Sequence, residues 1–581
     1  MGKNKNSCPS LTDIPRFLLI SLTMDAVLEE TTAYGRRQRL KTSPEGLDLR
    51  GVYDATLERI KEQDGDKTRL GVAALMWTSH SERLLQLDEL SHALAVEIGS
   101  TSLNPENIPS VELLLSSCLG LIIVDRETSI VRFIHYTLQE CLHTCPNLFG
   151  PTHSIMAETC LTYLNFGTIK HISPRLFSRP QKTPFLRYSS LYWGVHARRE
   201  ATSHVVSLAL QLFSQIESHI STKLLLADLI SATGRSSRGI PTNDPLARFT
   251  GLHCASIFGI VEVATCLMEY PNYDLNGRDS LGITPLIWAA IYGHEGVAQV
   301  LLEQATVNPD EPDGYFRQTA LSWAARKGHE GIVRLLLGWA TAEPDDIPVN
   351  IWRGKTPRVL NGVGRMRHVD PNWLDKYGQT PMLLAAEEGN WGVVQLLLER
   401  KDIKAGKSDN RGRIPLHCAA LHGHEGVVQA LLERGDVNPD KPTDGGRTPL
   451  SFAAWNGHEE VVKILLKLDD VNPDGADRSG ETPLCYAAEN GHEGVVRILL
   501  ERGDVNPNKA DNGRTPLSSA ARNGHEGVVG ILLERDDVNP DKVDNSGRKP
   551  LNWAAQNRHT GVINILLARG DIGPDKPDDF V

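Results

Sequence analysis

The feature that most constrains this chain is an internal repeat that runs from Thr250 towards its C-terminal end. The unit is clearest at Thr448, where it reads TPLSFAAWNGHEEVVKILLKLDDVNPD, and it recurs 34 residues later at Thr482. Further copies begin at Thr250, Thr284, Thr319, Thr380, Ile414, Thr515 and Lys549. A fixed period of this length indicates supersecondary units that stack and share one elongated core. Such an array offers a long surface to other macromolecules rather than a closed catalytic pocket.

Each copy is predicted to form two short helices followed by an extended loop. Thr448 can cap the first helix, because its hydroxyl can accept a free backbone N–H, and Pro449 suits the first helical position. Gly457 permits the left-handed conformation that ends this helix. Apolar residues at positions 461, 462, 465 and 466 then form one broad face of a second helix.

The recurring pattern TPL-x-x-AA-x-x-GH-x-x-VV-x-x-LL resembles the ankyrin repeat, and nine copies carry most of it. The resemblance implies L-shaped units whose first helices line a concave groove. It places the residue before TPL and the two residues before GH on that groove, where arginine and aromatic side chains are frequent binding anchors. The candidate partner-binding residues are Ile291, Tyr292, Arg326, Lys327, Glu387, Glu388, Arg413, Leu421, His422, Arg447, Trp455, Asn456, Glu481, Glu489, Asn490, Arg514, Arg522, Asn523 and Arg548. The alternative is that they are solvated positions under weak constraint.

Two other repeat positions are interpreted as structural. The residue two after the first-helix leucine should form a core ladder between neighbouring units, and it reads Trp288, Trp323, Leu384, Cys418, Phe452, Tyr486, Ser519 and Trp553. The histidine after the glycine recurs at His294, His329, His424, His458, His492 and His525. One histidine per unit leaves neighbours roughly 10 Å apart, too far to share a metal ion, so we expect a hydrogen bond at the turn and no metal site.

The array is interrupted between Thr319 and Thr380, which are 61 residues apart. The fragment from Thr356 keeps the opening TP and a closing DPN but lacks the alanine pair and the leucine run. A defective unit weakens coupling across it, so the stack could divide into two blocks here.

The part of the chain before Thr250 is not repetitive. Helical periodicity is expected over residues 17–30, 52–61, 68–79, 87–96 and 111–119, and the run LIIVD-RETS-IVRFIH is typical of a β-hairpin. Three helices followed by a hairpin is the order of a winged helix. DNA binding is disfavoured, because the third helix, VELLLSSCL, has no Arg, Lys, Asn or Gln to contact bases or phosphates.

The order FLLISLTMDAVLEE, YDATLERI, ALMW-x5-RLLQLDELSHALAVE and VRFIHYTLQECL resembles the region behind the nucleotide-binding core of NACHT-type STAND ATPases. In fungi these proteins commonly carry C-terminal ankyrin arrays. In that family the histidine of this last motif reaches the ADP phosphates, so the resemblance would give His135 that role. The chain departs from the family because GxxxxGK[ST] and a strand ending in paired acids are absent. We therefore expect no cofactor and a vestigial His135, in a protein that lacks the nucleotide-binding core.

Composition limits the partners and the compartment. The net charge of −11 disfavours a general polyanion binder, and the nine cysteines show no disulfide or zinc spacing. The start of the chain has no secretory signal, and the longest apolar stretch, 111–124, is too short to span a bilayer. We expect a cytoplasmic location, with the nucleus as the alternative, and neither nucleic acid nor membrane as a partner.

These patterns predict a mostly α fold, with a winged-helix-like and helical N-terminal region followed by an ankyrin-repeat solenoid. The expected segments are a helical segment resembling the post-NACHT helical domain (1–66), a winged-helix-like domain (67–145), a helical linker region (146–249), a first block of repeats (250–345), a degenerate repeat or loop (346–379) and a second block (380–581).

The expected function is that of a protein–protein interaction scaffold, which binds a protein through the groove within a signalling or self-recognition receptor of STAND type. The alternative is a regulatory fragment that docks in trans on the nucleotide-binding core of a NACHT ATPase. No catalytic arrangement stands in a suitable local context, so we do not expect an enzyme.

Overall fold

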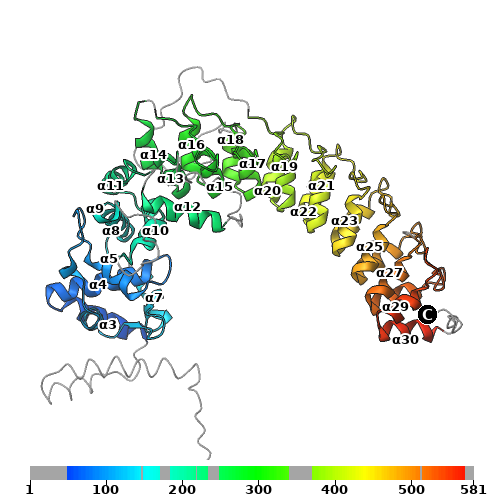
Figure 1. The fold of residues 1–581 in the computed structure, drawn as a ribbon, viewed down its shortest axis with the longest axis horizontal. Coiled ribbons are helices and arrows are strands. Elements are labelled where there is room, and N and C mark those ends of the chain that lie inside the picture. Colours follow the sequence, from blue (N-terminus) through cyan, green and yellow to red (C-terminus); the bar gives the residue numbers. More distant parts are fainter. Residues whose placement is uncertain are drawn as a thin grey trace, which may run out of the picture. The chain divides into compact units, whose positions relative to one another are not determined.

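The computed structural model describes residues 49–144, 148–170, 183–216, 219–232, 248–271, 273–338, 369–510 and 513–569. It is mostly helical and divides into two units, residues 1–273 and 274–581, which are described separately here (Figure 1). The helix expected over 17–30 and most of the segment 346–379 lie outside the described residues. Within the described residues, no helix has the length and apolar character needed to cross a membrane.

The first unit begins with the expected helices and hairpin. Its elements are α3 (Leu49–Lys61), α4 (Gly65–His80), α5 (Leu87–Ala95), η1 (Pro105–Asn107), α6 (Val111–Ser117), β1 (Ile122–Val124), β2 (Val131–Phe133) and α7 (Tyr136–His143). The strands are antiparallel, with Ile122 opposite Phe133. Asp125 shapes the turn between them, because its Oδ1 accepts hydrogen bonds from the backbone N–H groups of Glu127 and Thr128 at 3.1 and 3.0 Å. Helix α3 packs against α4 and α7.

The remainder of the first unit is a helical bundle. It comprises α8 (Thr152–Leu164), α9 (Gly167–Lys170), α10 (Leu186–Arg199), α11 (Ser203–Phe213), α12 (Ile220–Ala232), α13 (Gly251–Phe258) and α14 (Val261–Met268). Helix α8 packs against α10 and α11. The copy that begins at Thr250 forms the pair α13–α14, which packs on α10 and α11. Gly194 is required at this contact, because a Cβ there would lie 2.1 Å from the ring of Phe258.

The second unit is a stack of helix pairs, each made of a first and a second helix (Figure 1). The pairs are α15 (Pro285–Tyr292) with α16 (Glu295–Leu302), α17 (Ala320–Lys327) with α18 (Glu330–Leu336), α19 (Pro381–Glu387) with α20 (Trp391–Leu398), α21 (Pro415–His422) with α22 (Glu425–Glu433), α23 (Pro449–Asn456) with α24 (Glu459–Leu466), α25 (Pro483–Asn490) with α26 (Glu493–Leu500), α27 (Pro516–Asn523) with α28 (Glu526–Leu533), and α29 (Pro550–Gln556) with α30 (Thr560–Ala568). First helices pack on first helices and second helices on second helices.

The predicted local signals are confirmed in the unit that begins at Thr448. The Thr448 hydroxyl accepts a hydrogen bond from the backbone N–H of Ser451 at 3.3 Å. Gly457 ends α23 with a φ of 78°, in the left-handed region that favours glycine. The core ladder is also confirmed, because six of its eight members are buried, while Ser519 and Trp553 are half-buried.

The histidine after the glycine joins neighbouring repeats, which confirms the expected hydrogen bond, and His559, which follows Arg558, makes the same contact in the last unit. Its Nε2 lies within hydrogen-bond distance of a main-chain oxygen near the end of the preceding first helix. The contacts are His329 to Ile291 (3.1 Å), His424 to Glu387 (3.2 Å), His458 to Leu421 (3.0 Å), His492 to Trp455 (2.9 Å), His525 to Glu489 (2.9 Å) and His559 to Arg522 (3.0 Å). The bond lies between units, so it fixes the stacking of repeats as well as the turn.

The possible division of the array near residue 345 is not observed. Helix α17 packs directly on α19, as other consecutive first helices do. Asn390 stands where other units carry histidine, and its Nδ2 donates to the main-chain oxygens of Ala325 and Arg326, both at 2.9 Å. The Arg326 guanidinium also reaches Glu388 at 3.1 Å. The helices on the two sides of the interruption therefore form one continuous stack within this unit.

Candidate functional site

The candidate partner-binding residues lie at the C-terminal ends of the first helices and in the loops that precede them. In each pair before the glycine, one side chain is exposed and its neighbour is half-buried or exposed. Ile291, Lys327, Glu387, Leu421, Glu489 and Asn490 occupy these helix ends, and Glu481 and Arg514 lie just before their first helices. The positions thus recur along one line of the stack, one set per repeat.

Arg447, Trp455 and Tyr486 form the most developed cluster on this line. The Arg447 guanidinium carbon lies 4.7 Å from the ring centre of Trp455 and 4.8 Å from that of Tyr486. Its Nε donates to the Tyr486 hydroxyl at 2.8 Å. Trp455 keeps 38% of its surface exposed. The cation holds the indole in place, which presents a large apolar face at low entropic cost.

Asp477 contacts both Tyr486 and Arg447 in this cluster. Its Oδ2 accepts the Tyr486 hydroxyl at 2.5 Å, and its Oδ1 accepts the backbone N–H of Glu481 at 3.0 Å. Burial opposes the charged form, but these hydrogen bonds and that of Arg447 leave the pKa of Asp477 below its ordinary value. Burial and the bond to Asp477 raise the pKa of Tyr486. The carboxylate is therefore the fixed anion that orients both the arginine and the tyrosine.

A second aromatic and cationic group lies at the last repeat. The guanidinium carbons of Arg548 and Arg522 lie 3.7 and 5.2 Å from the ring centre of Trp553. The indole Nε1 donates to Asp544 at 3.1 Å. Arg413 differs, because it is largely covered and forms an ion pair with Asp409 at 2.8 Å. Along the line of candidates, some repeats thus combine arginine with an aromatic ring, whereas at Arg413 the arginine charge is neutralised by an aspartate.

Several candidates also have a structural role. Asn456 donates to the main-chain oxygen of Leu421 at 2.9 Å, and Asn523 donates to that of Glu489 at 2.7 Å. Arg326 and Glu388 pair across the interruption, as described above. His422 Nδ1 lies 3.0 Å from the main-chain oxygen of Cys418. Tyr292 stacks on Trp288 with ring centres 6.0 Å apart. Substitution of Asn456, Asn523, Arg326 or Glu388 would therefore change contacts between repeats as well as the surface, whereas the contacts of His422 and Tyr292 lie within one helix.

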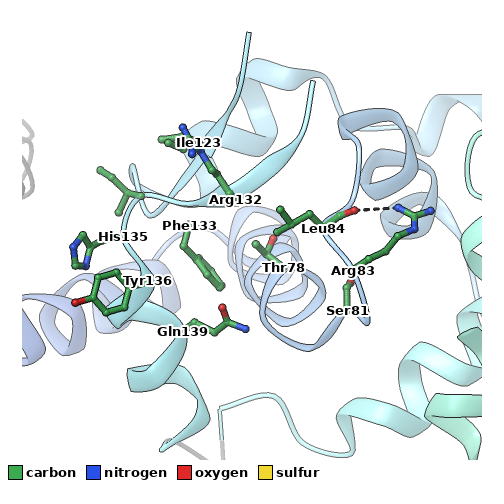
Figure 2. Close-up of a pocket in the computed structure, with 11 residues that line it drawn as sticks. Thr78, Ser81, Arg83, Leu84, Ile123, Arg132, Phe133, His135, Tyr136 and Gln139 are labelled. Atoms are coloured by element: carbon green, nitrogen blue, oxygen red, sulfur yellow. Dashed lines mark hydrogen bonds between the residues drawn. The ribbon is translucent and has the colours of Figure 1, made fainter. Parts of the chain in front are cut away.

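His135 lies beside a pocket of about 600 Å³ under the hairpin of the winged helix (Figure 2). The pocket is lined from α4, β1, β2 and α7, and Tyr136 at its edge is 70% exposed. His135 is the residue that caps α7: its Nδ1 accepts the backbone N–H of Thr137 at 3.4 Å and lies 2.8 Å from the Thr137 hydroxyl. That hydroxyl lies 2.9 Å from the hydroxyl of Tyr53. The structure thus gives His135 a capping role that the resemblance did not suggest.

The described cysteines are all buried except Cys266, which is partly exposed. Among the described residues, no group of three or more His, Cys, Asp or Glu side chains is placed to hold a metal ion. Cys254 and Cys418 are buried at one repeat position, and burial raises the pKa of the Cys418 thiol to about 12. Such thiols are poor nucleophiles near neutral pH.

Tyr486 is the residue of the candidate site whose contact with Arg447 the sequence did not indicate. We expected it only in the core ladder, and it is buried there, but its hydroxyl also holds Arg447. The signal was the co-occurrence of arginine before one TPL motif and tyrosine in the following unit. Their proximity depends on how neighbouring repeats stack, which no single repeat reveals.

Two family profiles match this chain. The profile for ankyrin repeats (three copies) matches residues 223–313, 252–350, 358–442, 435–511 and 503–578, which together exceed half of the chain. The profile for the winged helix domain of GPI inositol-deacylase matches residues 58–145. No NACHT domain was found. The winged-helix match spans the helices and the hairpin around His135.

Proposed function

The chain belongs to the ankyrin-repeat family, and we propose that it is a scaffold that holds one protein partner on the line of first-helix ends centred on Trp455. Ankyrin repeats imply protein partners in general. The observation that supports this particular surface is that the Arg447 guanidinium lies near the rings of both Trp455 and Tyr486, whose centres are 6.1 Å apart, and so holds an exposed indole in place. The signalling or self-recognition role stays part of the proposal, because it rests on the resemblance to STAND receptors.

The test uses a photo-crosslinking amino acid in place of Asn490, which is exposed at the end of the next first helix, to identify the bound protein, whose affinity is then measured with the purified full chain. Trp455→Ala should weaken binding at least about tenfold, since aromatic anchors of this kind carry much of the binding energy. Lys463→Ala is the matched control, because Lys463 is a partly exposed residue of the second helix in the same repeat. Equal losses for the two variants, or no loss for Trp455→Ala, would reject the surface.

A second candidate is favoured by the winged-helix match and by the pocket beside His135. In this reading, residues 58–145 dock in trans on the nucleotide-binding core of a NACHT ATPase. Co-purification of the full chain with such a core should then be reduced by Tyr136→Ala, whose side chain is exposed at the pocket edge. Unchanged co-purification, or none with the unaltered chain, would leave only the array as the binding region.

A further inference from the structure

Two neighbouring loop tips in the array differ from the others. Residues 313–318 read Asp-Gly-Tyr-Phe-Arg-Gln, and the next tip, 375–379, reads Asp-Lys-Tyr-Gly-Gln. Tyr315 and Tyr377 are 51% and 48% exposed, and Leu374 beside them is 40% exposed. The corresponding tips further along carry Asn410 with Arg411, Asp444 with Gly445, and Arg478 with Ser479. Exposed aromatic side chains on the described tips are thus concentrated at one place.

The aromatic rings of this patch contact one another. Phe316 lies between the two tyrosines, with ring centres 4.7 Å from Tyr315 and 6.4 Å from Tyr377. The Lys376 Nζ lies over the Tyr315 ring, 5.1 Å from its centre. The patch therefore combines a cation with aromatic faces, which is a favourable arrangement for recognition.

Main-chain hydrogen bonds hold the tips side by side. The backbone N–H of Lys376 donates to the main-chain oxygen of Phe316 at 2.8 Å, and that of Asn410 donates to Tyr377 at 3.0 Å. The Trp373 indole donates to the main-chain oxygen of Arg317 at 2.8 Å. The surface is ordered before any partner arrives, which lowers the entropic cost of binding.

Arg317 has an unfavourable backbone conformation. Its φ is 59°, whereas the corresponding residues of other tips are glycines, such as Gly378 and Gly412 with φ of 75° and 76°. A side chain in this region costs conformational energy that glycine avoids. Strain of this kind at an exposed position suggests a functional use for the side chain.

The acidic residues of the same tips are turned inward. Asp313 and Asp375 are buried, and the Oδ1 of each accepts backbone N–H groups of its own loop. Arg317, Lys376 and Arg411 are exposed on three successive tips. The patch therefore presents positive charge next to exposed aromatic rings.

We propose that Tyr315, Arg317, Lys376, Tyr377 and Arg411 dock an extended acidic segment of the protein partner. The proposal rests on the proposed scaffold function and adds the chemical class of the bound segment. Stacked helices lie roughly 10 Å apart, and an extended chain rises about 3.3 Å per residue. An acidic residue at about every third position would therefore meet successive cations, with aromatic contacts between them. The net charge of −11 favours such a short segment over a long polyanion such as nucleic acid.

The test measures fluorescence anisotropy of a labelled (Glu-Ser-Tyr)₄ peptide with the full chain. The double variant Arg317→Gly, Lys376→Glu should weaken binding roughly tenfold, and added salt should weaken binding to the unaltered chain. Arg317→Gly alone should weaken binding while raising the thermal midpoint, because glycine relieves the strained φ. A lower peptide affinity together with a higher thermal midpoint would show that the variant has lost binding and not its fold.

Arg478→Glu is the matched control, because Arg478 has the loop position of Lys376 on a tip without aromatic residues. An equal loss for Arg478→Glu, equal binding of (Lys-Ser-Tyr)₄, or tighter binding of a twelve-nucleotide thymidine strand would each overturn the proposal. Trp455→Ala should leave binding of the acidic peptide unchanged. The cationic aromatic patch and the Trp455 surface can therefore fail independently of each other.

Discussion

Asp440 and Asp474 occupy a repeat position at which some other units carry asparagine. At Asn372, the Oδ1 accepts the backbone N–H of Lys404 and the Nδ2 donates to the main-chain oxygen of Asp402, both at 2.8 Å. Asp474 keeps the first bond, since its Oδ2 accepts the N–H of Asn506 at 2.9 Å. The Oδ1 atoms of Asp440 and Asp474 are buried and have no hydrogen-bond donor among the residues that the structure describes. A buried, unpartnered carboxylate oxygen is costly.

Asp440→Asn and Asp474→Asn should each raise the free energy of unfolding by about 1 kcal/mol at neutral pH. The new amide can donate to the next repeat, as Asn372 does. Urea unfolding measures the effect, and Asp444→Asn, at an exposed loop tip, serves as the control that should change little. A loss of stability in both buried variants would contradict this account.

The same position predicts a pH dependence. Burial raises the pKa of Asp440, so the folded state binds this proton more tightly than the unfolded state does. Ionisation of Asp440 therefore lowers the free energy of unfolding as the pH rises from the ordinary aspartate pKa through the raised pKa of the folded state. The stabilisation caused by Asp440→Asn should thus shrink when unfolding is measured below that range. A gain independent of pH would show that the carboxylate charge is not the cause.

At the scale of elements, four helices of the first unit meet around histidines. His80 of α4 lies with its ring centre 5.2 Å from His143 of α7 and 5.7 Å from His153 of α8. The Nδ1 atoms of His153 and His196 are 3.0 Å apart, and His196 Nε2 lies 2.9 Å from the Tyr188 hydroxyl. One of the two facing Nδ1 atoms must lack a proton for this contact to be a hydrogen bond.

Burial, together with neighbouring histidines and Arg199, lowers the pKa of His80 and lowers that of His196 to about 3. Burial also lowers the pKa of His153, against the effect of Glu82 and Glu200. The unfolded chain thus binds protons below about pH 6.5 that the folded one does not. We expect α8 and α10 to lose stability as pH falls from about 6.5 towards 4.

Hydrogen exchange of α8 and α10 in the full chain, corrected for the intrinsic rate, measures this loss. Helix α23, which contains no histidine, is the internal reference. His196→Gln should flatten the pH dependence of α10 relative to α23. An unchanged pH dependence would mean that other groups control it.

Most elements could be predicted from the sequence, because their signals are local. The threonine caps, the glycine ends and the aliphatic faces fix each helix pair, and the alternation around Asp125 fixes the hairpin. What could not be predicted depends on contacts between units: the oxygen that His492 bonds, the arginine that Tyr486 holds, and the helix that packs on α17. The sequence shows the aromatic residues of the two unusual loop tips, and it also shows that residues 313–318 contain one residue more than residues 375–379. That these tips form one cationic aromatic surface could be inferred only from the structure, which gives the positive φ of Arg317 and the burial of Asp313 and Asp375.

At the scale of the whole molecule, the helix stack of the second unit continues from α17 to α19 across the interrupted sequence. Asn390→Ala should cost about 1 kcal/mol of unfolding free energy, because it removes the bonds to Ala325 and Arg326. His424→Ala makes the matched comparison, since it removes the corresponding bond at the next junction. Comparable losses in urea unfolding are expected. A neutral Asn390→Ala beside a costly His424→Ala would show that the array is uncoupled at the interruption.

The histidine bonds between repeats all run in one direction, from each unit back to a main-chain oxygen of the unit before it. At most of the described junctions, a histidine Nε2 of one unit thus meets a main-chain oxygen of the unit before it, and Asn390 supplies the donor at one junction. If one whole repeat were deleted or duplicated in the gene, the histidine of the following repeat would meet an equivalent main-chain oxygen in its new neighbour. The length of such an array, and with it the number and order of surface side chains offered to a partner, can therefore change by recombination without the redesign of a single joint.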